Sequence, residues 1–171
     1  FMSQMTSKDA IPSDADFALA LKERNLYRKN ALCKYLLAAI ENQGKERIVT
    51  DNLTIEHIMP QNKNLSTAWQ KMLGDNWETV RDRYLHTLGN LTLTGYNSEL
   101  GDKPFAEKQE LLKAAVTHIT LLYDDVKTKT VWDSNAIEER AQNLADQLLR
   151  LFPIEQPVHK IEFKDPRYAI Y

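Results

Sequence analysis

The chain has 171 residues, 43% hydrophobic and 27% charged, a composition typical of a globular protein with a hydrophobic core. Its longest apolar runs are too short to cross a bilayer, and its N-terminus lacks the zones of a signal peptide. The net charge of −2 does not favour a nucleic-acid binder, although a metal ion and a local basic patch can bind phosphate on an acidic protein. The single cysteine, Cys33, excludes an internal disulfide, which favours a reducing cytoplasm, and its apolar helical surroundings indicate a core residue.

The first third of the chain is predicted to be mainly helical. Pro12-Ser13-Asp14 indicates a helix start, and an apolar pattern through Leu21 predicts a short amphipathic helix. Apolar residues at helical spacing predict a second helix over about 28–43. The segment 48–59 contains β-branched residues and an Asp-Asn turn, so we expect a short strand that leads into Glu56 and His57.

The rest of the chain is predicted to hold one more short strand among helices. Pro60 ends the first strand, and a polar loop follows over 61–66. Gly89-Asn90 introduces the alternating run Leu91-Thr92-Leu93-Thr94, which predicts a strand. Helical patterns lie at about 66–73, 76–87, 103–115 and 134–152. These elements predict an α+β fold that is predominantly α-helical.

Two short motifs contain residues that could carry chemistry. Glu56-His57 before Pro60 can supply a metal ligand and a general base, but successive side chains of a strand point to opposite faces. Such a pair alone is more often a surface feature or a structural hydrogen bond. Asn90 beside Gly89 is most often a turn residue, and Asn97 could equally form an Asx turn or cap a helix. Each motif is therefore weak by itself.

The order of these motifs is more specific than either motif. Glu56-His57-Ile58-Met59-Pro60-Gln61, then Gly89-Asn90-Leu91, then Asn97 resembles HNH nucleases of the ββα-metal type. With His86 before Gly89 and Lys108 behind Asn97, the pattern is similar to the C-terminal nuclease domain of GmrSD-type modification-dependent restriction enzymes and related phage-defence proteins. The resemblance covers about residues 17–153. It implies a helical domain around a small ββα-metal (HNH) finger.

The resemblance also implies domain boundaries and roles for four residues. The nuclease domain would span 14–153, with its ββα-metal core at about 48–115, between an N-terminal linker or fragment boundary at 1–13 and a tail at 154–171. His57 would be the general base, and Asn90 would hold the loop and the base in place. Glu56 and Asn97 would bind the metal, where relatives usually have Asp and often have His. Their hard oxygen ligands suit Mg²⁺ or Mn²⁺ better than Zn²⁺.

Four further residues near the motifs are candidates for contacts with DNA phosphates. They are His86, Lys103, Lys108 and Arg81. Each has an ordinary alternative: a histidine at a helix end can bind the last carbonyls, and basic side chains on a helix are usually solvated.

The resemblance implies a metal-dependent cytoplasmic endonuclease that hydrolyses DNA, as the C-terminal effector of a restriction or anti-phage protein. Its partners would be DNA, including modified phage DNA, and an N-terminal ParB-like domain of the same or a partner chain. No membrane partner is expected. Two alternatives stay open: a non-catalytic module that binds DNA or a partner, and an RNA-cleaving toxin domain.

Overall fold

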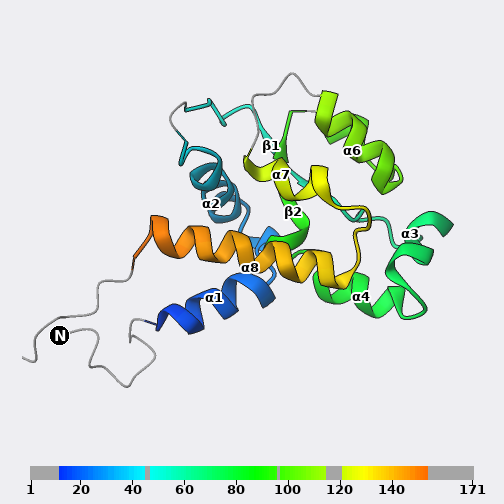
Figure 1. Cartoon of the computed structure of the whole chain (residues 1–171), viewed down its shortest axis with the longest axis horizontal. Coiled ribbons are helices and arrows are strands. Elements are labelled where there is room, and N and C mark those ends of the chain that lie inside the picture. The colour runs from blue at the N-terminus through cyan, green and yellow to red at the C-terminus, as the bar shows by residue number, and fades with distance from the viewer. Residues whose placement is uncertain (1–11, 45–46, 96, 115–120, 154–171) are drawn as a thin grey trace, which may run out of the picture.

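A computed structural model of the chain describes residues 12–44, 47–95, 97–114 and 121–153. This part is mostly helical, with a small antiparallel sheet of two strands (Figure 1). The predicted α+β, predominantly α-helical class is therefore confirmed. The tail predicted for 154–171, and all but the last two residues of the linker predicted for 1–13, lie outside the described residues. Over the described ranges, no helix has both the length and the apolar character of a membrane span.

The helices and strands are numbered in chain order, and η marks a 3₁₀ helix. They are α1 (Asp14–Glu23), η2 (Tyr27–Lys29), α2 (Asn30–Glu41), β1 (Thr54–His57), α3 (Thr67–Leu73), α4 (Trp77–Tyr84), η3 (Leu88–Asn90), β2 (Leu91–Thr94), α5 (Asn97–Leu100), α6 (Phe105–Ala114), α7 (Leu121–Thr128) and α8 (Ser134–Leu151).

Helix α8 is the central element of the fold. Its start is capped by Asp133, whose side chain accepts a hydrogen bond from the backbone N–H of Ala136. It runs across the middle of the molecule and contacts α1, α2 and η3 (Figure 1). Its buried stripe includes Ile137, Leu144 and Leu148 at helical spacing, which confirms the apolar face predicted from the sequence. Burial of this stripe joins the N-terminal helices to the segment that leads into β2.

The two strands pair in a register that places Glu56 opposite Thr92 and His57 opposite Leu91. The alternating Leu-Thr sequence of β2 is typical of a strand with one exposed face, yet all four of its residues are buried. Thr92 lies on the same side of the sheet as its partner Glu56, whose side chain contacts Lys108 of α6, so the threonine side is covered as well. Helices α2 and α7 also contact β2. Helix α7, which the sequence patterns did not predict, is thus part of the reason that β2 is fully buried.

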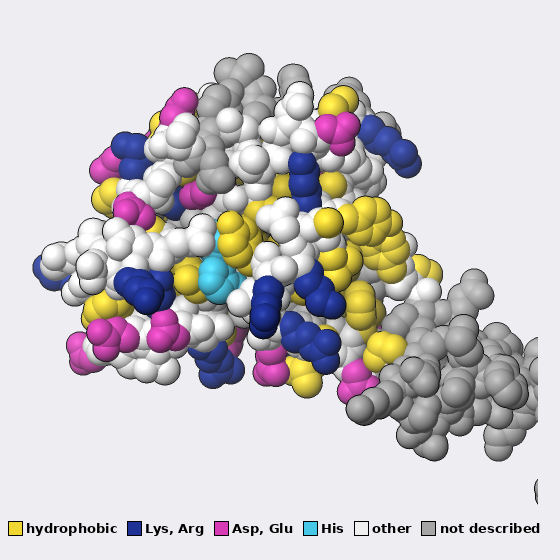
Figure 2. All heavy atoms as spheres, turned by 180° about the vertical axis from the view of Figure 1, so that it is seen from behind, with side chains coloured by type: hydrophobic (Ala, Val, Ile, Leu, Met, Phe, Trp, Pro, Cys, Tyr) yellow, Lys and Arg dark blue, Asp and Glu magenta, His cyan; other side chains and the backbone are white. Residues whose placement is uncertain are grey.

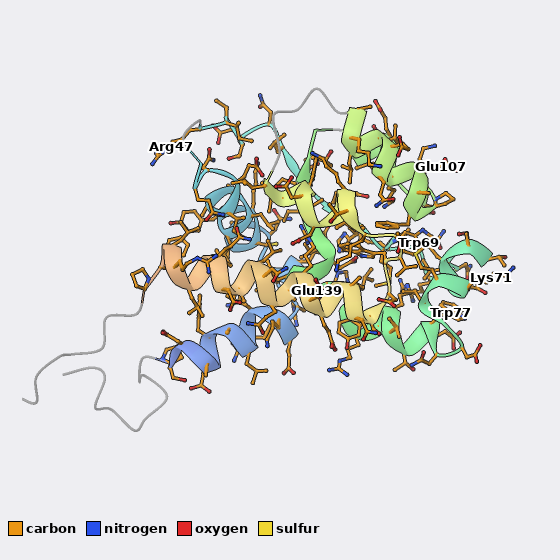
Figure 3. The ribbon with its side chains drawn as sticks, in the orientation of Figure 1. Arg47, Trp69, Lys71, Trp77, Glu107 and Glu139 are labelled. Atoms are coloured by element: carbon orange, nitrogen blue, oxygen red, sulfur yellow. The ribbon has the colours of Figure 1, made fainter. Side chains whose placement is uncertain are left out.

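Two of the three tryptophans are almost completely buried. Trp69 of α3 (Figure 3) contacts the loop before α6, where its indole N–H donates to the carbonyl of Lys103 over 3.0 Å. Trp132 is fully buried before α8. Trp77 is half-buried and packs against the core from α4. The hydrogen bond of Trp69 fixes the loop that leads into α6 and therefore helps to place Lys108.

Candidate functional site

Glu56 and His57 end β1, and their side chains contact different partners. The Glu56 carboxylate accepts a hydrogen bond from Lys108 Nζ of α6 at 2.8 Å, and the same ammonium group donates to the backbone carbonyl of His57 at 2.8 Å. The His57 imidazole instead contacts His86 and Tyr27. The alternation of a strand thus separates the two side chains, while Lys108 contacts both the Glu56 carboxylate and the backbone of His57.

Asn90 is completely buried and forms four side-chain hydrogen bonds. Its Oδ1 accepts from the backbone N–H of Met59 at 2.7 Å and from the indole N–H of Trp132 at 3.1 Å. Its Nδ2 donates to the carbonyls of Met59 at 3.1 Å and Leu85 at 3.0 Å. These bonds use the full capacity of the amide. Asn90 therefore fixes the backbone two residues after His57, which supports its assignment as a positioning residue rather than a metal ligand.

The turn before β2 is held tightly against α8. A Cβ on Gly89 would lie 2.1 Å from the carbonyl oxygen of Ile137, so only glycine allows this approach. The buried guanidinium of Arg140 donates to the carbonyls of Gly89 and Leu91 at 2.8 and 2.9 Å. Burial lowers the pKa of Arg140 to about 10, so it stays charged at neutral pH. Gly89 and Leu91 are therefore both held in place, which fixes the backbone position of Asn90 between them.

The His57 side chain has one bonded and one unbonded nitrogen. Its Nε2 lies 3.0 Å from Nδ1 of His86, whereas its buried Nδ1 has no hydrogen-bond partner within the described ranges. Burial, His86 and Lys108, in that order, lower the pKa of His57 to about 3. The imidazole is therefore neutral at pH 7, the state in which a histidine can accept a proton.

Tyr27 completes this cluster and was missed by the sequence analysis. Its ring lies parallel to His86, with centroids 5.3 Å apart, and meets His57 edge-on at 4.6 Å. The backbone N–H of Leu26 donates to the carbonyl of His86 at 3.0 Å, which brings η2 to the loop after α4. No motif in the sequence marks Tyr27, because only tertiary packing brings it to the site.

The surface near this cluster is locally basic. Seen from behind the view of Figure 1, a histidine side chain reaches the surface between several Lys and Arg side chains (Figure 2). His57 is only 2% exposed, whereas His86 is half-buried. This face could therefore attract an anionic ligand although the whole chain carries a net charge of −2.

Glu56 and Lys108 form a buried ion pair. Burial raises the pKa of Glu56 and lowers that of Lys108, and the attraction between the two charges opposes both shifts. Lys108 is 1% exposed and shares the inner face of α6 with Phe105 and Leu112. A lysine at this apolar position of the helical pattern was a sequence signal of its burial. The placement makes Lys108 a partner of Glu56 rather than a surface contact for DNA.

The predicted metal ligands are only partly described. Helix α5 begins at Asn97 and lies against β1, but the Asn97 side chain is outside the described residues. Glu56 Oε1 is bound to Lys108, and its side chain is about 10% exposed. Among the described residues no group of three or more His, Cys, Asp or Glu could hold a metal ion. The donor chemistry fits a hard cation through the Glu56 carboxylate, with Asn97 on the adjacent helix.

The other two candidates for DNA contacts have different surroundings. Arg81 is buried and donates to the carbonyls of Gln61 and Asn62 at 2.5 and 3.0 Å, so it holds the loop after Pro60. This placement favours a structural role for Arg81. Lys103 is exposed at the start of α6, 3.4 Å from Glu107, and its ammonium group is accessible to a phosphate.

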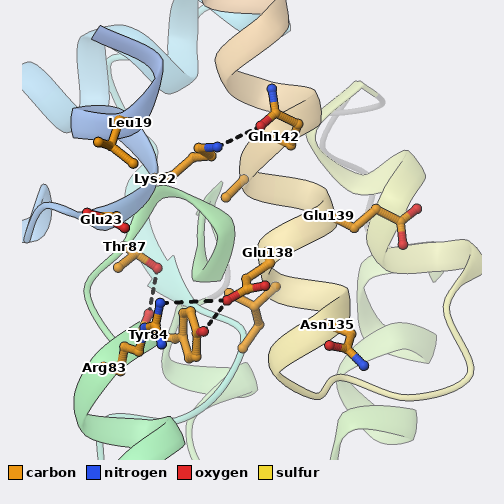
Figure 4. Close-up of a pocket in the computed structure, with 12 residues that line it drawn as sticks. Leu19, Lys22, Glu23, Arg83, Tyr84, Thr87, Asn135, Glu138, Glu139 and Gln142 are labelled. Atoms are coloured by element: carbon orange, nitrogen blue, oxygen red, sulfur yellow. Dashed lines mark hydrogen bonds and ion pairs between the residues drawn. The ribbon is translucent and has the colours of Figure 1, made fainter. Parts of the chain in front are cut away.

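A separate pocket of about 660 Å³ lies between α1, α4 and α8 (Figure 4). None of the predicted site residues lines it. Several of its polar groups bond to one another: Glu138 contacts the Tyr84 hydroxyl and Arg83, and Lys22 donates to Gln142. The chemistry suggested by the motifs therefore lies elsewhere, at the end of β1.

Comparison with protein families identifies the chain. Residues 11–147 match the family described as GmrSD restriction endonucleases, C-terminal domain. The chain belongs to this family. No match was found among curated proteins. Membership in the GmrSD C-terminal family points to a nuclease of the restriction-endonuclease kind, which acts on DNA, and it confirms the resemblance read from Glu56 to Asn97.

Proposed function

We propose that this GmrSD C-terminal domain is an HNH-type endonuclease that hydrolyses DNA phosphodiester bonds with His57 as general base. The observation that carries the proposal is the buried, neutral imidazole of His57, whose Nδ1 is unbonded within the described ranges. The order β1, β2, α5, with Glu56-His57 on the first strand and Asn97 at the start of the helix, supports the ββα-metal assignment.

In the proposed reaction, a water oxygen attacks phosphorus as its proton passes to Nδ1 of His57, and the bond to the leaving sugar oxygen breaks. Nδ1 is shielded in the DNA-free chain, so the proposal requires that DNA binding admit water to it. The negative charge of the phosphate would also raise the pKa of His57 from about 3 towards neutrality, which makes it a stronger base. Asn90 maintains the position of the base through its hydrogen bonds to Met59.

Glu56 and Asn97 are the proposed ligands of Mg²⁺ or Mn²⁺. When bound, such an ion stabilises the charge that develops on the scissile phosphate and the leaving oxygen. Lys108 neutralises Glu56 and holds the strand backbone at His57. Lys103 is the best placed of the predicted basic residues to contact a neighbouring phosphate, since it is exposed. The proposed setting is a cytoplasmic restriction or anti-phage system, in which a ParB-like domain selects modified DNA.

A plasmid assay tests this function. Supercoiled plasmid, modified phage DNA and an RNA of similar length would each be incubated with the chain and Mg²⁺ or Mn²⁺. We expect nicked or linear DNA from the wild type, no cleavage in EDTA, and a loss on the order of 10²–10⁴ in rate for His57→Ala. Asn97→Ala should also lose most of the activity, because it removes a proposed ligand.

Lys71→Ala serves as the matched control, because Lys71 is exposed on the outer side of α3 (Figure 3). It should cleave like the wild type. Intact DNA in every reaction, or equal cleavage by wild type and His57→Ala, would contradict the proposal. Cleavage of RNA alone would replace it with the RNA-directed alternative.

A further inference from the structure

The ring of His57, at the end of β1, contacts the rings of His86 and Tyr27, which come from two other segments of the chain. We propose that His86 is a positioning residue that sets the tautomer of His57 by accepting a hydrogen bond from its Nε2–H. The bond joins His57 Nε2 and His86 Nδ1 over 3.0 Å. This inference rests on the proposed role of His57 as the general base.

The buried surroundings of His57 favour one of its two neutral tautomers. If His86 donated its Nδ1–H to His57, the proton of His57 would be on Nδ1, where no described residue accepts it. A buried N–H without an acceptor costs about 1–3 kcal/mol and is rare in folded proteins. With the proton on Nε2, that N–H is paired with His86, and Nδ1 keeps a free lone pair. The favoured tautomer is therefore the one that a general base requires.

The same bond fixes the tautomer of His86. If its Nδ1 accepts from His57, a neutral His86 must carry its own proton on Nε2. His86 is half-buried rather than buried, so this N–H is available as a donor to a phosphate oxygen of bound DNA. One histidine then orients the base and also offers a donor to the substrate. The parallel ring of Tyr27, 5.3 Å away and inclined by 8°, restricts rotation of His86 and so maintains the bond.

The tautomer can be measured without any cleavage. Long-range ¹H–¹⁵N correlation spectra of the full chain distinguish a protonated ring nitrogen from one with a lone pair. We expect His57 to be protonated at Nε2 and unprotonated at Nδ1 in the wild type, and to show a mixture of both tautomers in His86→Ala. A wild-type His57 that carries its proton on Nδ1 would overturn the inference, whatever the activity.

Variants at His86 separate its two roles. In His86→Asn the amide ends near the position of Nδ1 and keeps an acceptor for His57, whereas in His86→Gln it reaches the position of Nε2. We expect His86→Ala to lower kcat by at least about tenfold, towards the ~10⁴-fold cost of a wrong histidine tautomer in a serine protease. His86→Asn should recover most of kcat with a raised KM, and His86→Gln should not recover kcat.

The outcomes distinguish this inference from the proposed function. Loss of cleavage in His57→Ala together with unchanged kcat in His86→Ala would leave His57 as the base and overturn the role of His86. Equal losses of kcat in His86→Ala and His86→Asn would also overturn it, because the retained acceptor would then have no effect. Full activity of His57→Ala would instead refute the proposed function itself.

Discussion

Replacing Asn90 with alanine should remove the hydrogen bonds that hold the backbone just after the proposed base. The substitution leaves four groups without their partner: the N–H and the carbonyl of Met59, the carbonyl of Leu85 and the indole N–H of Trp132. Each unpaired buried group costs about 1–3 kcal/mol, which sums to about 4–12 kcal/mol. A water molecule can enter the space and bond several of these groups, so we expect the lower end, about 4 kcal/mol.

Urea unfolding followed by far-ultraviolet circular dichroism measures this loss. With a slope near 2 kcal/mol per molar urea, a loss of about 4 kcal/mol moves the midpoint down by about 2 M. Asn76→Ala is the matched control, because Asn76 is exposed before α4 and its side chain makes no capping bond. Its effect should stay within about 0.5 kcal/mol. If Asn90→Ala lowers the free energy of unfolding by less than about 1 kcal/mol, the hydrogen bonds of Asn90 do not hold this part of the fold, and its assignment as a positioning residue is refuted.

Three further predictions concern burial. Gly89→Ala places a Cβ 2.1 Å from a backbone carbonyl of α8 and should cost about 2 kcal/mol or more in urea unfolding, whereas Gly44→Ala, which has open space, should change little. Lys108→Met leaves the Glu56 carboxylate buried and unpaired, which should lower the free energy of unfolding by about 3–5 kcal/mol. The double variant Lys108→Met/Glu56→Gln should recover part of this loss, because it also removes the buried charge. No recovery in the double variant would contradict the pairing of the two residues. Burial raises the pKa of Cys33 to about 12, so at pH 8 its thiol should react with a maleimide only after the chain unfolds. Rapid labelling of the folded chain would contradict the burial of Cys33.

Most of the fold could be predicted from local patterns, because long amphipathic helices have a regular apolar period. The stripe of α8 and the strand that follows Gly89-Asn90 were both found in this way. Helix α7 was missed although Leu122, Tyr123 and Val126 are buried at helical spacing, because so short an apolar run does not distinguish a helix from a buried strand. Burial of the threonines in β2 was also not foreseen, since it depends on helices that are distant in the sequence.

The candidate site was only partly predictable, for a physical reason. Glu56, His57 and Asn90 form part of short motifs, so the sequence alone could mark them. Tyr27 belongs to a single turn of 3₁₀ helix and reaches the site through a backbone hydrogen bond between Leu26 and His86. Contacts of this kind arise from tertiary packing and leave no spacing pattern in the chain.

The geometry of β1 explains why both Lys108 and His86 accompany the Glu56-His57 pair. Adjacent residues of a strand cannot direct their side chains to one point without help from the surroundings. Lys108 binds the Glu56 carboxylate and the His57 carbonyl at 2.8 Å each, so it fixes the carboxylate and the backbone of the proposed base together. His86 then fixes the ring of His57 through a contact that does not involve Glu56. The backbone and the ring of the proposed base are thus held by different residues, which is why a substitution at His86 can change the tautomer of His57 while the Glu56–Lys108 pair stays in place.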